Sequence, residues 1–253
     1  MKQPQPRPPG ELQKARRTPL KLVASDLAMT RNGRVLFANL SFTLRPGELV
    51  AVRRPNGAGK STLLRIAAGE EQPDEGRVRF VGTDLRAAPD ALRKQIAFCN
   101  TRYLPAHGRD ACEHVAMPLF AVSISRDEAA VRAHRALERV GAADIAFTPP
   151  AAWIPSEVVR ISLARAIVRE PRLLIFDEPT NGVDALERDP LLLLIQRIAH
   201  ESGIATLLTA GDTASVTCAD RVLRLSDGEL LGRTAPAAAE VVALRPPAAG
   251  SAS

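Results

Sequence analysis

The chain has 253 residues, of which 45% are hydrophobic and 25% are charged, and a formal net charge of +6. This composition excludes fibrous, collagen-like and wholly disordered proteins, and the length suits one large α/β domain or one domain with a helical insert. Residues 1–21 hold six basic residues against one acidic residue, which accounts for +5 of the net charge. The remainder is close to neutral, so we expect no nucleic acid partner.

Both ends of the chain have compositions typical of flexible segments. Residues 1–19 are basic and Pro-rich, and residues 234–253 are rich in Ala and Pro, so we expect two disordered tails. The alternative for the first tail, attraction to anionic lipid, stays open. No apolar run approaches the roughly 18 residues that a membrane span needs, and residues 1–10 lack the apolar core of a signal peptide.

Three cysteines, Cys99, Cys112 and Cys218, are an odd number without close pairing or partner histidines. They predict neither a disulfide framework nor a zinc site, and they fit a reducing cytoplasm. Trp153 is expected to pack the helical insert against the core. The histidines are scattered and are interpreted as surface or packing residues; they are His107, His114, His134 and His200.

Between the tails, over residues 20–233, apolar segments alternate with helical patterns, which is typical of a sheet covered by helices. The expected strands, in chain order, are 20–24, 35–44, 48–53, 77–81, 95–99, 172–176, 204–209 and 222–225. Residues 103–150 carry apolar positions near helical spacing, such as Val131, Leu137 and Val140. We therefore expect an inserted helical subdomain at about 102–168. The break at Pro190 predicts that a core helix begins at Leu191.

A glycine-rich segment between an expected strand and a helical pattern is the strongest chemical signal. Its backbone N–H groups can converge on phosphate oxygens, and the helix dipole adds positive potential there. Lys60 would bridge the outer phosphates, and the Ser61 hydroxyl would ligate Mg²⁺. Arg54 stands where the motif normally opens with glycine; its Cβ crowds the turn, while its charge offsets some of that cost. The expected nucleotide-binding residues are Arg54, Pro55, Asn56, Gly57, Ala58, Gly59, Lys60, Ser61, Thr62 and, further along the chain, Asp177.

An acidic pair follows the apolar strand expected at 172–176. A carboxylate that leaves a buried strand beside a phosphate loop is placed to hold Mg²⁺, directly or through water. The next carboxylate can polarise an attacking water. Asp177 is therefore the expected metal ligand together with Ser61, and Glu178 the expected catalytic base.

The segments Arg-Pro-Gly-Glu-Leu-Val at 45–50, Arg-Ile-Ser-Leu-Ala-Arg-Ala at 160–166 and Asn-Gly-Val-Asp at 181–184 surround these two sites. With them, nearly the whole core resembles the ATP-binding cassette (ABC) ATPases. Residues 115–119 and 219–229 are most similar to the branch that serves lipoprotein release and macrolide efflux. Residues 36–44 are also similar to the ATPases of haem export for cytochrome c assembly, so both branches stay open.

The resemblance implies an α/β fold: a P-loop NTPase core of ABC type with an N-terminal antiparallel β subdomain and an inserted α-helical subdomain. It also implies ATP and Mg²⁺ as cofactors, and a head-to-tail dimer that places each ATP between the phosphate loop of one subunit and the signature helix of the other. The implied partner is a separate membrane-spanning transporter subunit. The expected location is therefore cytoplasmic, peripheral on the inner face of the plasma membrane.

Departures from the family pattern fall on groups that contact nucleotide. The signature Leu-Ser-Gly-Gly-Gln corresponds to residues 153–157, where Ile154 has no hydroxyl and Pro155 has no N–H. Thr101 stands for a glutamine that reaches Mg²⁺ and water, and Gly211 stands for the switch histidine. The aromatic residue that stacks on adenine is missing, and Arg31, which follows Thr30, is a candidate to replace it.

These departures predict a homodimer or heterodimer with slow hydrolysis, and they favour a heterodimer with an intact ATPase subunit. The leading hypothesis is thus the ATPase subunit of an ABC transporter. The alternative is a non-hydrolysing, nucleotide-dependent regulatory or interaction protein on the same fold. A small-molecule kinase is less well supported, because residues 177–184 suit water activation between subunits better than transfer to a bound acceptor.

Overall fold

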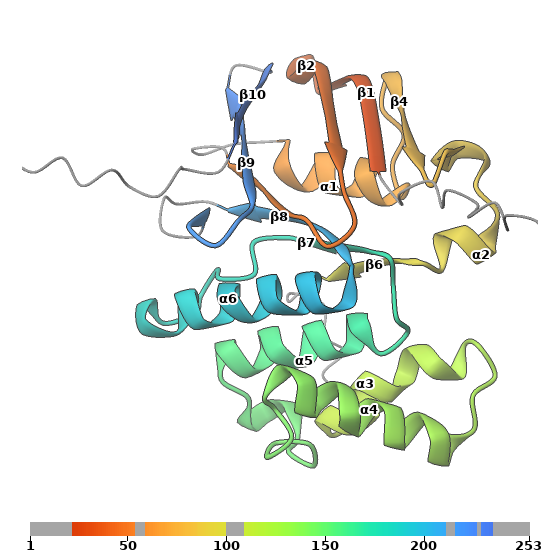
Figure 1. Ribbon diagram of the computed structural model, residues 1–253, viewed down its shortest axis with the longest axis vertical. Coiled ribbons are helices and arrows are strands. Elements are labelled where there is room, and N and C mark those ends of the chain that lie inside the picture. Colours follow the sequence, from red (N-terminus) through yellow and green to blue (C-terminus); the bar gives the residue numbers. More distant parts are fainter. Residues whose placement is uncertain (1–21, 54–58, 100–108, 211–215, 227–228, 235–253) are drawn as a thin grey trace, which may run out of the picture.

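The computed structural model describes residues 22–53, 59–99, 109–210, 216–226 and 229–234. Both expected tails lie outside these residues, except for Thr234, which ends a strand. Two sheets form the framework, with α1 between them and the remaining long helices on the far side of the second sheet (Figure 1).

The first sheet is antiparallel, in the order β2-β1-β4-β5, and is built from the N-terminal part of the chain. The second has the order β10-β9-β3-β8-β7-β6, and its neighbours run parallel except for β10, which pairs antiparallel with β9. The strands are β1 (Leu22–Arg31), β2 (Arg34–Leu44), β3 (Leu49–Arg53), β4 (Glu75–Phe80), β5 (Thr83–Asp84), β6 (Ile96–Cys99), β7 (Leu173–Phe176), β8 (Ala205–Ala210), β9 (Arg221–Ser226) and β10 (Glu229–Thr234).

Alternation along the central strands supplies two hydrophobic cores. In β3, Leu49 and Ala51 pack into the core shared with the helical layers, whereas Val50 and Val52 pack into the core shared with the antiparallel sheet and α1. Strand residues point alternately to opposite faces, so a strand buried on both sides is apolar throughout. The same rule assigns the residues at the strand ends to one face or the other.

The helices are α1 (Lys60–Ala68), α2 (Asp90–Arg93), α3 (Ala111–Phe120), α4 (Arg126–Val140), α5 (Pro155–Ile167) and α6 (Ala185–Ser202), with short 3₁₀ turns η1 (Leu85–Ala87) and η3 (Pro150–Ala152). Local signals set their ends. Asp110, Ser125 and Asp184 each accept a hydrogen bond from a backbone N–H of the first turn, and Gly141 and Gly203 end α4 and α6 in the left-handed conformation.

The fold class predicted from the sequence is confirmed: an α/β core, an antiparallel sheet from the N-terminal strands, and helices inserted between β6 and β7. Seven of the eight expected strands match within two residues at each end. The strand expected at 20–24 is wrong in extent, because β1 continues to Arg31 past an irregularity where Asp26 has a φ of 51°. A strand that bulges loses its strict alternation, which is the signal that sequence patterns provide.

One expectation about the helices is wrong. The core helix begins at Ala185 and not at Leu191, because the Asp184 side chain caps it and Pro190 lies inside it. Pro190 has no N–H to donate to the carbonyl of Leu186, as a regular helix would require. Leu186 is 87% exposed near the helix start, so water can satisfy this carbonyl. Val131 is not on the buried face of α4; it is 48% exposed, whereas Leu137 and Val140 are buried.

Candidate functional site

The carboxyl ends of β3, β7 and β8 meet at one edge of the parallel sheet, where α1 begins. The residues predicted to bind nucleotide at 54–58 lie outside the described residues. Gly59 precedes α1 with a φ of 122°, a backbone conformation that favours glycine. The first turn of α1 thereby presents Lys60 and Ser61 to the ends of β7 and β8.

Lys60 and Glu178 form an ion pair in this edge, with Nζ 2.6 Å from Oε1. The Lys60 ammonium also donates to the carbonyl oxygen of Ala210 at 3.5 Å. The Lys60 side chain is only 11% exposed and that of Glu178 27% exposed, so the pair is largely shielded from water. The structure therefore brings the predicted phosphate-binding lysine and the predicted catalytic carboxylate into direct contact.

Ser61 and Asp177, the two predicted metal ligands, also lie together. The Ser61 hydroxyl donates to Asp177 Oδ2 at 2.7 Å, and Asp177 follows β7 on the side that faces α1. Mg²⁺ prefers oxygen ligands and usually takes one or two protein ligands, with phosphate oxygens and waters completing its shell. A hydroxyl and a carboxylate oxygen held this close fit that requirement. Thr62, also predicted to bind nucleotide, is 5% exposed, and its hydroxyl accepts from Arg65 at 3.3 Å.

Sequence reasoning missed two contributors from β8. Thr209 donates its hydroxyl proton to Asp177 Oδ1 at 2.8 Å and accepts from the backbone N–H of Glu178 at 3.0 Å. Ala210 contributes the carbonyl that receives Lys60. The available signal was a second hydroxyl, next to the last residue of a largely apolar strand, Ala-Thr-Leu-Leu-Thr-Ala.

The start of α5 carries the residues aligned with the family signature. Ile154 precedes the helix and Pro155 is its first residue, and both are exposed. Glu157 Oε2 accepts from the backbone N–H of Ile154 at 2.9 Å, so Glu157 caps its own helix. Ser156 is 3% exposed. Among the described residues at this helix start, neither Ile154 nor Pro155 offers a side-chain donor.

Other predicted departures are resolved only in part. Thr101 and Gly211 lie outside the described residues. The Arg31 guanidinium pairs with Glu71, which also accepts from Arg65 at 2.8 Å, so this candidate for stacking on adenine is held in an ion-pair network beyond the end of α1. The backbone N–H of Thr30 donates to Asp74 at 2.6 Å.

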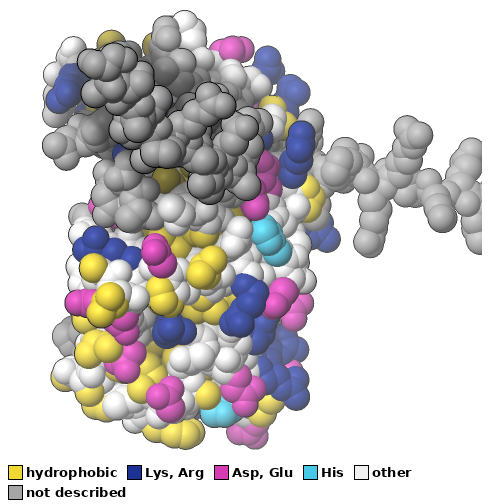
Figure 2. All heavy atoms as spheres, turned by 60° about the vertical axis from the view of Figure 1, so that its left-hand side comes forward, with side chains coloured by type: hydrophobic (Ala, Val, Ile, Leu, Met, Phe, Trp, Pro, Cys, Tyr) yellow, Lys and Arg dark blue, Asp and Glu magenta, His cyan; other side chains and the backbone are white. Residues whose placement is uncertain are grey.

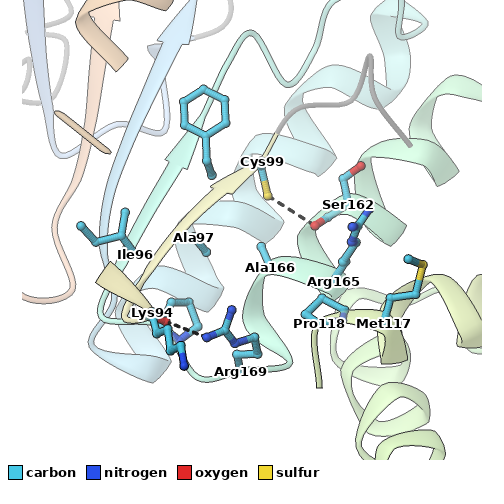
Figure 3. Close-up of a pocket in the computed structure, with 12 residues that line it drawn as sticks. Lys94, Ile96, Ala97, Cys99, Met117, Pro118, Ser162, Arg165, Ala166 and Arg169 are labelled. Carbon is cyan, nitrogen blue, oxygen red and sulfur yellow. Dashed lines mark hydrogen bonds between the residues drawn. The ribbon is translucent and has the colours of Figure 1, made fainter. Parts of the chain in front are cut away.

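A groove of about 450 Å³ lies between strand β6, helix α3 and helix α5 (Figure 3). Its lining is apolar along the strand and at Met117 and Pro118. It carries three cations, Lys94, Arg165 and Arg169, and none of its described lining residues is acidic. The Ser162 hydroxyl, buried in the same wall, has no hydrogen-bond partner. This groove is separate from the Lys60 site, on the other face of the parallel sheet.

Trp153 packs within the helical layer: its ring lies edge-on to His114, with centroids 5.2 Å apart, and its Nε1 donates to the carbonyl of Thr148 at 3.1 Å. All three cysteines are buried and free. Burial raises the pKa of Cys99, and it raises that of Cys218 to about 11. The described residues include no group of three or more His, Cys, Asp or Glu side chains that could hold a metal ion. Over the same part of the chain, every helix is too short or too polar to span a bilayer.

Comparisons with known proteins agree with this geometry. A family model described as "ABC transporter" matches residues 37–181. The lipoprotein-releasing system ATP-binding protein LolD of Ruegeria sp. (strain TM1040) is 34% identical over 214 residues, covering 82% of this chain and 93% of that protein. The aliphatic sulfonates import ATP-binding protein SsuB of Pseudomonas putida is 35% identical over 212 residues, covering 83% of this chain and 75% of that protein.

Among solved structures, the dimeric structure of MJ0796, a bacterial ABC transporter cassette, superimposes with a TM-score of 0.74 at 23% identity. The match covers 84% of this chain and 98% of that one. A second structure of the same cassette, in a post-hydrolysis state bound to ADP and phosphate, also has a TM-score of 0.74. At this identity the likeness supports the fold.

Proposed function

Because the chain belongs to the ATP-binding cassette family of transporter ATPases, we propose that Lys60, Ser61 and Asp177 hold Mg-ATP and that Glu178 activates water. ATP and Mg²⁺ are the cofactors of this family. The observation that carries the proposal is the convergence of these four side chains at one sheet edge, through the Lys60–Glu178 contact of 2.6 Å and the Ser61–Asp177 contact of 2.7 Å.

Each residue has a defined task in this proposal. Lys60 exchanges its contact with Glu178 for the terminal phosphates, which frees the Glu178 carboxylate to accept a proton from water. Ser61 and Asp177 orient the magnesium ion, which supplies positive charge to the phosphate oxygens. The predicted contacts of residues 54–59 add backbone N–H groups and the charge of Arg54 to the same anion.

We propose that hydrolysis is slow, because the start of α5 offers little to nucleotide. Ile154 and Pro155 are exposed there, so they face whatever docks on this surface, but they lack the hydroxyl and the N–H of the family signature. Each charge-assisted hydrogen bond that is lost costs about 1.5 to 3 kcal/mol. The absence of the switch histidine, with Gly211 in its place, removes a further proton-handling group, typically worth about 10² to 10⁴-fold in rate.

The surface around this helix start supports a dimer. Figure 1 places the beginnings of α5 and α6 on the same side of the molecule, and Figure 2, which brings that side forward, shows hydrophobic side chains grouped across it. Large hydrophobic side chains here are strongly exposed: Phe147 at 78%, Leu186 at 87% and Ile154 at 50%. Large apolar side chains that are exposed on one side of a protein favour an interaction site there.

We propose a heterodimer over a homodimer. In a homodimer both nucleotides would face the Ile154–Pro155 helix start, whereas beside an intact ATPase subunit only one of them would. The other nucleotide would then lie between this chain's Lys60 site and a complete signature of the partner.

We propose that a membrane-spanning subunit docks in the groove between β6, α3 and α5. The protein would then lie on the cytoplasmic face of the plasma membrane. Its described lining combines apolar residues with three cations, Lys94, Arg165 and Arg169, and includes no acidic residue. Charge complementarity therefore favours a partner segment that carries a carboxylate beside apolar side chains. Relatives that release lipoproteins and relatives that import sulfonates match about equally well, so the proposal concerns nucleotide and coupling and names no cargo.

The test uses the purified full-length chain. Calorimetry should detect Mg-ATP binding that Lys60→Ala abolishes, and steady-state turnover should be slow and fall to background in Glu178→Gln. Brisk turnover by the homodimer would refute the proposal that hydrolysis is slow. Failure to bind adenine nucleotide at about millimolar concentration would refute the assignment of the site.

The partner is tested separately by co-purification. A multispan membrane protein should accompany the wild type and Arg132→Glu, a charge reversal on the exposed side of α4, but not Arg165→Glu in the groove. Retention of nucleotide binding without any membrane partner would favour the regulatory alternative.

A further inference from the structure

Thr209 is a fully buried polar side chain near the end of the central strand β8, with a relative exposure of 0%. Its neighbours in the strand, Leu207 and Leu208, are buried in opposite cores. Because residues alternate, Thr209 shares the face of Leu207, which is the face covered by α1. Register places it beside the residue that follows β7, since Phe176 pairs with Leu208. That residue is Asp177.

The Thr209 hydroxyl is both a hydrogen-bond donor and an acceptor toward the acidic pair. It donates to Asp177 Oδ1 at 2.8 Å and accepts from the Glu178 N–H at 3.0 Å. Asp177 Oδ2 meanwhile accepts from Ser61. With one donor on each oxygen, the carboxylate has a single orientation, in which Oδ2 faces the Ser61 hydroxyl.

The second bond acts on the backbone. Glu178 has a φ of 45°, in the left-handed region that costs a non-glycine residue about 1 to 2 kcal/mol. The bond from its N–H to Thr209 helps to hold that conformation, which directs the Glu178 side chain toward Lys60. A single buried hydroxyl therefore links the orientation of both carboxylates.

We propose that Thr209 is a positioning residue for both carboxylates: it aligns Asp177 with Ser61 as a magnesium site and sets the direction of Glu178. This inference rests on the proposed function for its meaning. In this proposal the hydroxyl acts through the two groups that it orients.

The test compares Thr209→Val with Thr209→Ser and with Thr206→Val. Valine keeps the shape and removes the hydroxyl, and serine keeps the hydroxyl. Thr206 is a matched control: it is also 0% exposed in β8, but its hydroxyl donates to the nearby carbonyl of Ile204. It thus reports the effect of burying valine in this strand without touching the acidic pair.

The readout is ADP affinity by calorimetry, with Mg²⁺ and with a chelator. In Thr209→Val the gain in affinity that Mg²⁺ provides should fall about tenfold, as expected for one or two lost hydrogen bonds, while affinity in chelator stays unchanged. Thr209→Ser should recover most of the gain, and Thr206→Val should match the wild type. A Thr209→Val variant whose magnesium gain equals that of Thr206→Val overturns the proposal.

Crystal structures provide a readout that needs no nucleotide. In Thr209→Val the Asp177 carboxylate should turn away from Ser61, and Glu178 should leave its left-handed backbone conformation. If both stay in place, Thr209 does not position them. A wild type that binds no nucleotide would refute the proposed function, while this structural comparison would still decide the role of Thr209.

Discussion

The imidazole of His114 is buried without a hydrogen-bond partner among the described residues. Acid should therefore destabilise the protein, because the unfolded chain takes up a proton that the folded chain resists. The side chain is 0% exposed, neither ring nitrogen has a partner, and Trp153 lies against the ring. Desolvation lowers the pKa of His114, and the charges of Arg165 and Arg109 lower it further, while Asp110 and Glu113 oppose them in part. Pro118 also removes the helical N–H that would donate to the backbone carbonyl of His114.

The sign and size follow from linkage. The unfolded chain binds the proton near its ordinary pKa of 6.5, whereas the folded protein resists it, so stability is lost as the pH falls below 6.5 toward the lowered pKa. Protonation of the unfolded chain alone sets the upper limit of this loss, about 2 kcal/mol between about pH 7 and about pH 5. The loss levels off once the pH falls through the lowered pKa of the folded state.

Urea denaturation of the wild type and His114→Leu at several pH values measures this loss. Leucine gives up the edge contact with Trp153, worth about 0.5 to 1.5 kcal/mol, but removes two unpaired buried nitrogens, worth about 1 to 3 kcal/mol. The variant should therefore equal or exceed the wild type near neutrality and gain on it by up to about 2 kcal/mol toward about pH 5. His134→Ala, which removes a half-buried histidine of α4 away from Trp153, is the matched control. Parallel stability curves for the wild type and His114→Leu would refute the reasoning.

Three further outcomes are expected. Gly76→Ala should cost about 3 kcal/mol in urea denaturation, because its Cβ would lie 2.4 Å from the carbonyl oxygens of Ser25 and Asp26 at a φ of 82°; Gly33→Ala, with a φ of 72° and open space, should cost about 1 to 2 kcal/mol. Arg93→Ala should cost about 2 kcal/mol, because Arg93 donates to three backbone carbonyls, and an unchanged denaturation midpoint would contradict this. Cys218, 8% exposed with a pKa raised to about 11, should be alkylated at about pH 8 roughly 10²-fold more slowly than a free thiol, as mass spectrometry can follow.

Local pattern was enough to predict most of the strands and the two halves of the site. A buried strand such as β7 is apolar throughout, and it ends where the apolar run ends. The phosphate loop and the acidic pair are defined by short segments, so the sequence predicts both. That Lys60 contacts Glu178 and Ser61 contacts Asp177 depends on which strands are neighbours, which a local pattern does not determine.

Features that depend on register or on tertiary context could not be predicted. Thr209 becomes a site residue only because β8 lies beside β7 in a register that places it next to Asp177. Pro190 can lie inside α6 because the carbonyl of Leu186, which loses its helical donor, is near an exposed helix start. That depends on burial in the folded chain and not on helix propensity. The irregular course of β1 at Asp26 likewise follows from pairing with both β2 and β4.

The site divides physically into a part that the chain completes alone and a part that it leaves to another subunit. Lys60, Ser61, Asp177, Glu178 and Thr209 are tied to one another by four contacts at one sheet edge, so they are preorganised before any phosphate arrives. The exposed start of α5 offers a proline and an aliphatic side chain in place of donors. In the proposed function, preorganised groups that bind, combined with a poor surface for closing over a second nucleotide, would favour retention of ATP over its turnover. In the proposed heterodimer this chain would then contribute its Lys60 site to the more active nucleotide position and its α5 surface to the more static one.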